Sequence, residues 1–221
     1  MGPLQLVLFC GCFIAGVLAG SKYDSNVYID SIVSTVLPAN ARSLGLDSVD
    51  VPSYAFVVKS TSLTNRDLHA EFHGGKLVGL VSPGLVRWGD CSAPGWQGFN
   101  VTLGCYLSLD NLHLSYVGSA KGDSVLNTNK TLSLNVVPVK SSAFIEVTSG
   151  SGGIPSLKTW LIRPLNFSVG VTKPLTLNDQ RKTAFQSEIA KHSQAALLNV
   201  LLVSFKEAVE RSVRSVKMPK P

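Results

Sequence analysis

The stretch AALLNVLLVSF, residues 195–205, decides the fold because it is apolar on nearly every side of a helix. It belongs to a segment that is typical of one helix, from a cap at Asn178 or Asp179 to about Val213. At about 1.5 Å per residue, this helix would be roughly 50 Å long. Two apolar stripes follow its opposite sides: Leu198, Leu201, Leu202, Phe205 and Val209 form one, and Phe185, Ile189, Ala196, Val200 and Val203 form the other.

A surface helix needs only one apolar stripe, so two stripes predict burial on both sides. The eleven residues of the stretch are too few to cross a bilayer, which takes about 20. We therefore expect the helix to lie inside the protein, with a sheet on one side and another helix or a ligand on the other.

A second helical pattern begins near Asn26. Its apolar residues recur at helical spacing and would cover one side of a helix: Tyr28, Ile29, Ile32, Val33, Val36 and Leu37. Pro38 should kink or end this helix, because proline lacks a backbone N–H and its ring clashes with the preceding turn. Gly45 suits the stop that follows.

Between the helices, apolar and polar residues alternate as in β-strands. His69, Glu71 and His73 would face solvent, and their neighbours would face the core. The core faces of the clearest strands are Leu68, Ala70 and Phe72; Val101, Leu103, Cys105, Leu107 and Leu109; Leu132, Leu134 and Val136; and Leu165, Phe167, Val169 and Val171. Such runs, separated by turn residues, indicate antiparallel strands. The order predicts an α+β fold in which a long curved antiparallel sheet rolls around the N-terminal and the long C-terminal helix.

Residues 1–20 contain no charged side chain and are mostly apolar. They predict a secretory signal peptide that is cleaved near Ala19 or Gly20. An uncleaved anchor is the alternative, but the run is short and rich in glycine for a spanning helix. Residues 21–221 would then form a single secreted domain.

Cleavage would remove Cys10 and Cys12 and leave Cys91 and Cys105, which are 14 positions apart. Two cysteines in a secreted chain most simply form one disulfide. Closing a loop of this length stabilises a fold by about 3 kcal/mol. Two thiols are too few for a structural zinc site without histidine partners.

Three sequons, at Asn100, Asn129 and Asn166, predict glycosylated surface positions. The chain has a net charge of +6, and its last residues, 211–221, form a basic tail. The tail contains four of the cations: Arg211, Arg214, Lys217 and Lys220. This charge indicates either affinity for anionic surfaces or only a well-solvated exterior.

The sequence contains no nucleophile, zinc-protease, nucleotide or dinucleotide motif, and no catalytic, metal or cofactor site is predicted. On a strand, His69 and His73 would lie roughly 13 Å apart and could not share one ion. We expect Trp96 and Phe99, in the loop that the disulfide would close, to pack locally. The alternative is that this loop touches a membrane or the mouth of a cavity.

The order of elements and four segments resemble the tubular lipid-binding (TULIP-like) superfamily. Within it, the chain is similar to the group 7 dust-mite allergens and the juvenile-hormone-binding and takeout proteins of arthropods, and more distantly to bactericidal permeability-increasing protein. The matching segments are the helix YIDSIVSTVLPANARSLGLD (28–47), the connector LDSVDVP (46–52), the segment GGKLVGLVSPGLVRWGDC (74–91) and the long C-terminal helix. The third of these is expected to form two strand segments joined by a turn.

This resemblance implies a tubular apolar cavity and a secreted, non-enzymatic protein that buries a fatty acid, phospholipid or terpenoid. The residues expected to line the cavity are Ile32, Val36, Ile189, Leu198, Leu201, Leu202 and Phe205. Each of them is also explained by an ordinary core position. The alternative function is an interaction protein that binds an anionic membrane, a glycan or a host protein through its basic surface. No nucleic-acid motif is present.

Overall fold

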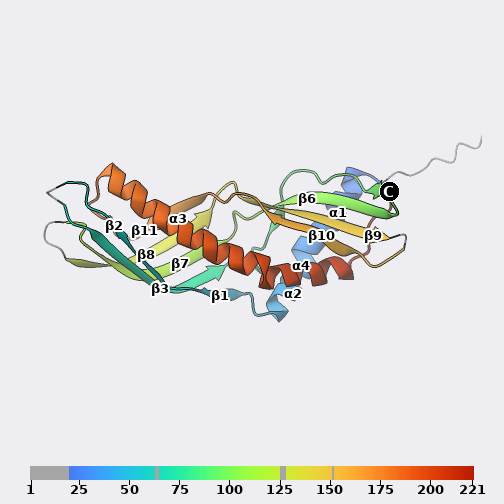
Figure 1. The fold of residues 1–221 in the computed structure, drawn as a ribbon. Coiled ribbons are helices and arrows are strands. Elements are labelled where there is room, and N and C mark those ends of the chain that lie inside the picture. Colours follow the sequence, from blue (N-terminus) through green and yellow to red (C-terminus); the bar gives the residue numbers. More distant parts are fainter. Residues whose placement is uncertain (1–19, 63–64, 125–127, 151) are drawn as a thin grey trace, which may run out of the picture.

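The computed structural model of the chain describes residues 20–62, 65–124, 128–150 and 152–221. Apart from Gly20, the predicted signal peptide lies outside these ranges. The molecule is elongated, with one antiparallel sheet toward each end and the C-terminal helices running past both (Figure 1). The α+β class and the antiparallel pairing are confirmed, but the strands form two sheets where one long sheet was predicted.

The first sheet, sheet A, has six strands in the order β1-β3-β7-β8-β11, and β2 also pairs with β3. Its members are β1 (Ser48–Val51), β2 (Tyr54–Val58), β3 (Leu68–Val78), β7 (His113–Lys121), β8 (Asn129–Pro138) and β11 (Phe167–Val171). The alternation predicted for β3 is confirmed: His69, Glu71 and His73 are exposed, while the residues between them are buried.

The second sheet, sheet B, has five strands in the order β10-β9-β6-β4, and β5 also pairs with β6. Its members are β4 (Val86–Arg87), β5 (Gly95–Gln97), β6 (Asn100–Ser108), β9 (Ser142–Gly150) and β10 (Ser156–Ile162). The segment 74–91 contributes the end of β3, a turn and β4, as predicted. It therefore links the two sheets.

The C-terminal helix is not continuous, and this corrects the prediction. It consists of α3 (Asp179–Leu202) and α4 (Ser204–Ser215), with Val203 between them in a non-helical conformation. The predicted cap is confirmed, because the Asn178 side chain accepts a hydrogen bond from the Arg181 backbone. At the break, the Trp160 indole donates to the Leu201 carbonyl at 3.0 Å.

The N-terminal helix consists of α1 (Lys22–Ser31), a π-helical segment η1 (Ile32–Val36) and α2 (Leu37–Ser43). Pro38 neither ends this helix nor donates a hydrogen bond to it. In a regular α-helix its ring would clash with the carbonyl four residues earlier, and the π-helical segment η1 lies directly before α2, in which Pro38 is the second residue. Gly45, at φ +72°, provides the predicted stop.

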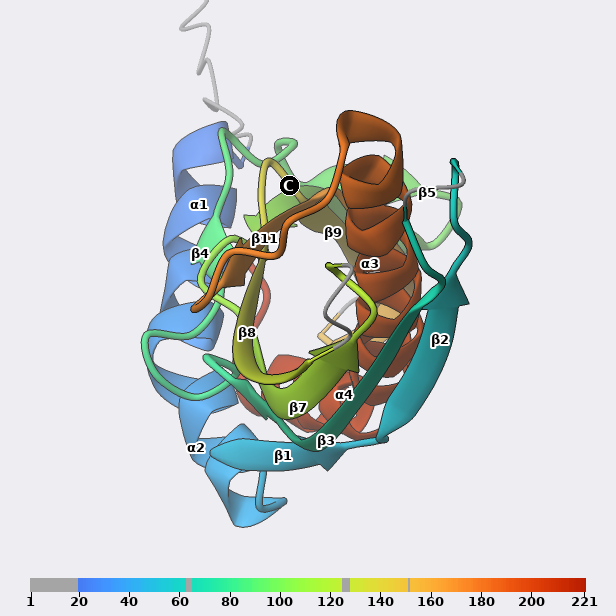
Figure 2. The same ribbon diagram turned by 90° about the vertical axis from the view of Figure 1, so that its left-hand side faces the viewer.

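The helices join the two sheets into one hydrophobic core. Helix α4 packs on α2, η1 and β10, whereas α3 contacts β2, β11 and β10. Figure 2 shows sheet A curling around the long axis of the molecule, with α3 beside its open edge. Sheet A and α3 thus form a roll, and sheet B and the other helices extend it.

Candidate ligand-binding site

The residues predicted to line a cavity are spread along the core. Ile32, Ile189, Leu201 and Phe205 are fully buried, and Val36 and Leu198 are partly buried. Leu202, the last residue of α3, lies apart from them and is 45% exposed. None of these residues borders either of the two grooves described below. Their contact with a ligand stays a prediction.

Inside sheet A, aromatic rings from three strands, β2, β3 and β7, and from α3 meet in an aromatic cluster. Its members are Tyr54, Phe56, Phe72, Tyr116, Phe185 and His192. Tyr54 is central: its ring stacks on His192 with centroids 4.5 Å apart and meets Tyr116 edge-on at 5.0 Å. Such pairs add to the stability that comes from burial alone. The interior of sheet A is therefore filled by rings.

Two phenol groups of the aromatic cluster have an unusual environment. The hydroxyls of Tyr54 and Tyr116 are buried, and neither has a hydrogen-bond partner among the described residues. Burial raises the pKa of Tyr116 to about 12. Burial and then the neighbouring Tyr116 raise the pKa of Tyr54. A buried, unpaired hydroxyl costs about 1–3 kcal/mol, so this end of the core combines dense packing with unsatisfied polar atoms.

A groove of about 400 Å³ lies between β2 and the start of α3. Arg181 lines it but is only 2% exposed. Its guanidinium donates to the carbonyls of Arg66 at 2.6 Å and Gly122 at 3.0 Å. These bonds tie together the connections at this end of sheet A. Arg181 therefore has a structural role that accounts for its burial.

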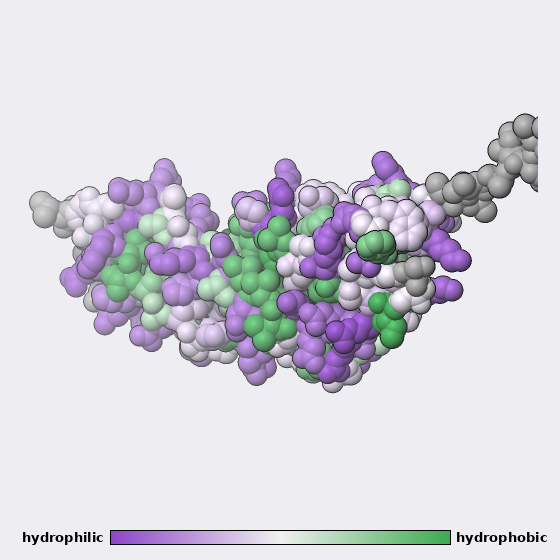
Figure 3. All heavy atoms as spheres, turned by 45° about the vertical axis from the view of Figure 1, so that its right-hand side comes forward, coloured by the Kyte–Doolittle hydropathy of each residue, from purple (hydrophilic) through white to green (hydrophobic). Residues whose placement is uncertain are grey.

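The larger groove, called the tail groove, lies at the opposite end of the molecule and has a volume of about 610 Å³. The turn between β9 and β10 forms one wall, and the chain after α4 forms the other. Its apolar surface comes from Trp96, Val101, Ile154, Pro155, Val216, Met218, Pro219 and Pro221. Figure 3 turns this end of the molecule forward and shows hydrophobic side chains set among hydrophilic ones.

Local sequence explains both walls of the tail groove. Helix α4 ends at Ser215, and the next residue, Val216, is extended. Met218 is 8% exposed and anchors the chain in the core. Across the groove, Gly152 adopts φ +71°, a conformation that glycine reaches without strain. The Ser149 hydroxyl donates to the Gly153 carbonyl at 2.8 Å and fixes this turn. The basic tail and the glycine-rich turn, which form the two walls, are both recognisable in the sequence. That the two segments lie next to each other in the fold was not predictable.

The electrostatic character of the tail groove is positive. Arg214, Lys217 and Lys220 line it, and each is exposed. Of the tail cations, Arg211 forms an ion pair with Glu207. The other three have no carboxylate at ion-pair distance among the residues that the structure describes. An anionic group at the groove would therefore meet cations that are not already neutralised.

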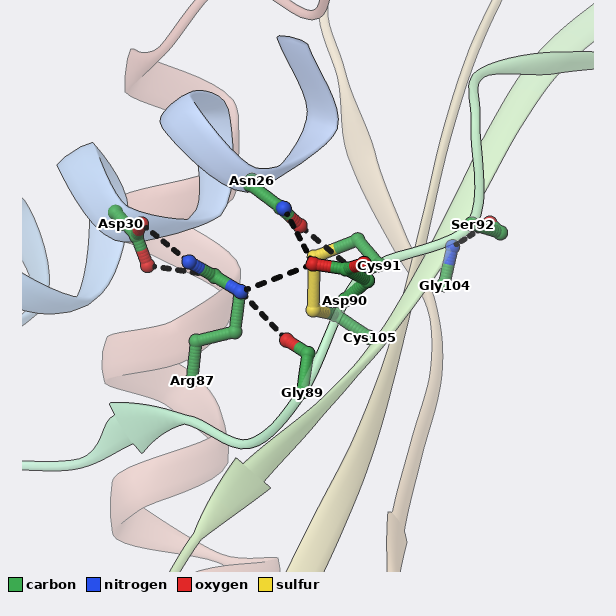
Figure 4. The surroundings of a disulfide bond; sticks show 9 residues. All are labelled: Asn26, Asp30, Arg87, Gly89, Asp90, Cys91, Ser92, Gly104 and Cys105. Atoms are coloured by element: carbon green, nitrogen blue, oxygen red, sulfur yellow. Dashed lines mark hydrogen bonds and ion pairs between the residues drawn. A yellow bond between two sulfur atoms is a disulfide. The ribbon is translucent and has the colours of Figure 1, made fainter. Parts of the chain in front are cut away.

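Cys91 and Cys105 form the predicted disulfide, with Cα atoms 4.4 Å apart. It lies beside α1, as Figure 4 shows. The Cys91 backbone N–H donates to the Asn26 side chain at 2.8 Å. Arg87 donates to both carboxylate oxygens of Asp30, at 2.9 and 3.0 Å. These contacts fasten the β4–β6 region to the N-terminal helix and hold the loop that contains Trp96.

The other predicted positions divide into confirmed and corrected ones. Asn100, Asn129 and Asn166 are all exposed, as their sequons require; glycan attachment stays a prediction. Trp96 and Phe99 do not pack locally, because their side chains are 59% and 94% exposed. Gly98, at φ +63°, forms the tight hairpin turn that projects Phe99 outward.

Within the described ranges, every helix is too short or too polar to span a bilayer. In the same part of the chain, no three His, Cys, Asp or Glu side chains gather as metal ligands would. His192 lies at the rim of the aromatic cluster, with Glu188 at 3.9 Å.

Comparison with known proteins gives a relative in sequence. The chain is 23% identical over 199 residues to the salivary anticoagulant protein P23 of Ixodes scapularis, covering 89% of each protein. No protein-family model matches. A crystal structure of lipopolysaccharide binding protein is similar over 89% of this chain and 39% of that one, at 15% identity and a TM-score of 0.48. The chain thus spans about two-fifths of that structure's length.

Proposed function

We propose that this protein is a secreted, non-enzymatic binding protein for an apolar ligand of the fatty acid, phospholipid or terpenoid class. Among these, the tail groove favours a ligand that has an acidic head. Secretion is supported by the disulfide, which persists in oxidising compartments, and by the name of the salivary relative. The sequence resemblance to tubular lipid-binding proteins points to the same class.

The tail groove is the observation on which this proposal rests. Its volume of about 610 Å³ falls within the range of small-molecule sites, about 300–1,000 Å³. An acyl chain against Val101, Pro155 and Met218 would gain about 0.8 kcal/mol for each buried methylene. A carboxylate or phosphate would lie near Lys217 and Lys220. This division into an apolar wall and a cationic rim matches an amphipathic molecule.

Native mass spectrometry of the secreted, deglycosylated protein, followed by solvent extraction, tests the proposal. We expect a defined co-purifying lipid or, after delipidation, uptake of a fluorescent fatty acid. Ile154→Glu should weaken uptake by about tenfold or more, because Ile154 lines the groove and is 77% exposed, so the change places a carboxylate in the groove wall without disturbing the core. Val117→Glu is the matched control, since Val117 is 47% exposed on sheet A. A protein that purifies empty and takes up no lipid would refute the proposal.

The alternative, a protein that binds a glycan, a membrane or a host protein through its basic surface with no ligand in the core, is favoured by the uncompensated tail cations. The name of the relative, an anticoagulant protein, is compatible with a host-protein partner. Ionic strength separates the alternatives, because surface charges are screened within about 8 Å at physiological salt. Lipid uptake that persists in 1 M NaCl would favour a ligand held in the tail groove. Loss of binding to anionic partners in 1 M NaCl, with no lipid uptake, would favour the basic surface as the binding site.

A further inference from the structure

Three large apolar side chains project from one end of sheet B. Phe99 is 94% exposed, Ile154 is 77% exposed and Trp96 is 59% exposed. Single exposed apolar residues are common on protein surfaces. Several gathered at one end of a molecule are not, and they mark surfaces that bind something.

The strand register brings these residues together. Gln97 pairs with Asn100 across the β5–β6 hairpin, and Asn100 pairs with Gly150 of β9. The hairpin turn that contains Phe99 and the β9–β10 turn that contains Ile154 therefore lie at the same end of adjacent strands. Figure 1 shows this end of β6 and β9 near the C-terminus. We call Trp96, Phe99 and Ile154 the apolar tip.

The apolar tip is held outward by its backbone. Gly98 turns the hairpin with φ +63°, and the disulfide between Cys91 and Cys105 closes the loop that leads into it. Trp96 and Phe99 make no ring contact with another aromatic residue of the described chain, in contrast to Trp160, which packs on Phe205. The exposure of the tip is therefore built into the fold.

Side-chain charge near the apolar tip is mainly positive, because the carboxylate beside the hairpin, Glu146, is paired with Lys158, which also donates to Gln97. Segments 92–104, 148–157 and 211–221 make up this end, and together they contain Arg211, Arg214, Lys217 and Lys220 but no Asp or Glu. Apolar side chains that protrude between cations complement an interface in which anionic head groups surround hydrocarbon. A protein partner fits less well, because a stable interface buries about 800 Å² on each side, and two narrow turns flanking a groove offer no such continuous surface.

We propose that this end of the molecule docks on an anionic phospholipid membrane. Phe99, Ile154 and Trp96 enter the boundary between head groups and acyl chains, while the tail cations contact phosphate and serine head groups. Docking requires no ligand in the tail groove, so this proposal stands apart from the proposed function. The groove opens at the same end, and a docked molecule would present its mouth to the bilayer.

A glycan on Asn100, the first sequon, would affect any measurement of membrane binding. Asn100 follows Phe99 and is exposed, so a glycan attached there would stand at the apolar tip and separate it from a membrane. The experiment therefore uses the Asn100→Gln protein as reference, with the two other sequons intact. The glycosylated protein is measured beside it, and weaker vesicle binding of the glycosylated form is expected.

Sedimentation with vesicles measures docking: one set contains phosphatidylcholine with 30% phosphatidylserine, the other phosphatidylcholine alone. Phe99→Ser and Ile154→Ser should each weaken binding to the anionic vesicles by about tenfold, because each removes a large apolar group that docking would bury in the membrane. Replacing Lys217 and Lys220 with Gln should weaken it by about fivefold per cation. Val57→Ser and Val117→Ser, at 43% and 47% exposure on sheet A, are the matched controls and should bind as the reference does.

The insertion of the apolar tip into the bilayer is tested with brominated acyl chains, which quench the fluorescence of tryptophan side chains in contact with them. We expect quenching of the reference protein and its loss in Trp96→Phe, with Trp88 and Trp160 still present. Three results would overturn the proposal: no binding of the reference protein to anionic vesicles, equal binding of the tip and control variants, or quenching unchanged in Trp96→Phe. A second copy of the chain is the alternative partner of the tip, and sedimentation velocity tests for it. A dimer that dissociates in Phe99→Ser would identify the tip as a contact between two copies.

Discussion

At the sheet A end, large aromatic side chains point inward and their polar atoms are buried with them. At the sheet B end, large apolar side chains point outward and cations surround them. The sheet A end is densely packed but leaves hydrogen bonds unformed, since the Tyr54 and Tyr116 hydroxyls have no partner in the described chain. The sheet B end leaves large apolar side chains unpacked, since Phe99 is 94% exposed. The sheet A end therefore stabilises the fold, whereas the sheet B end has side chains that are available for binding.

Removal of the disulfide tests whether the two ends are held independently. Cys91→Ala with Cys105→Ala should reduce the free energy of unfolding by about 3 kcal/mol. For a domain of this size, Tm should fall by about 6–12 °C. Calorimetry measures this change. Amide hydrogen exchange under native conditions should accelerate more in β4–β6 than in β3 and β7; equal acceleration in both sheets would mean that the ends are not independent.

Alkaline pH should destabilise the sheet A end. Burial raises the pKa of Tyr116 to about 12, whereas an unfolded tyrosine titrates near 10. Above pH 10 the unfolded chain releases this proton and the folded chain keeps it, so the free energy of unfolding falls as pH rises toward 12. The loss approaches about 1.4 kcal/mol for each pH unit in that window.

Urea unfolding at several values between pH 9 and 11.5 measures this slope. Lysine titrations also contribute there, so wild type is compared with Tyr116→Phe, which lacks the phenol. The variant should lose stability less steeply with rising pH. Parallel curves for the two proteins would show that Tyr116 is not responsible.

Tyr116→Phe at neutral pH should have the smallest effect and an uncommon sign. Deleting a buried hydroxyl that has no partner removes its desolvation penalty, so stability should be unchanged or rise by up to about 1 kcal/mol. Tyr106→Phe, whose ring is 40% exposed on sheet B, is the control and should be neutral. A clear loss of stability in Tyr116→Phe would indicate that the hydroxyl is hydrogen-bonded in solution.

Local patterns were sufficient for much of the fold. The alternation around His69 and His73 gave the inward face of β3, and the alternation around Cys105 gave that of β6. The Asn178 cap was predictable, because a side-chain oxygen before a helix satisfies its free N–H groups. The disulfide was predictable because two cysteines remain in residues 21–221. Each of these depends on neighbours in sequence or on simple counting.

Features set by distant contacts could not be predicted. The break at Val203 coincides with the hydrogen bond from Trp160, more than 40 positions away in sequence. Apolar periodicity continues through Leu202 and Val203, so the sequence favours one unbroken helix there. The tail groove likewise depends on where residues 214–221 lie against the β9–β10 turn. Periodicity reports which side of an element is buried, and it does not report which elements meet.

The break at Val203 has a mechanical consequence. An unbroken helix transmits rotation and axial displacement along its length, but a non-helical residue between two helices uncouples them. A rearrangement of α3 within the sheet A roll therefore does not have to turn α4 or the tail that follows it. Trp160 contacts both sides of the break, through Leu201 and Phe205, and so connects the two helices beside their axis.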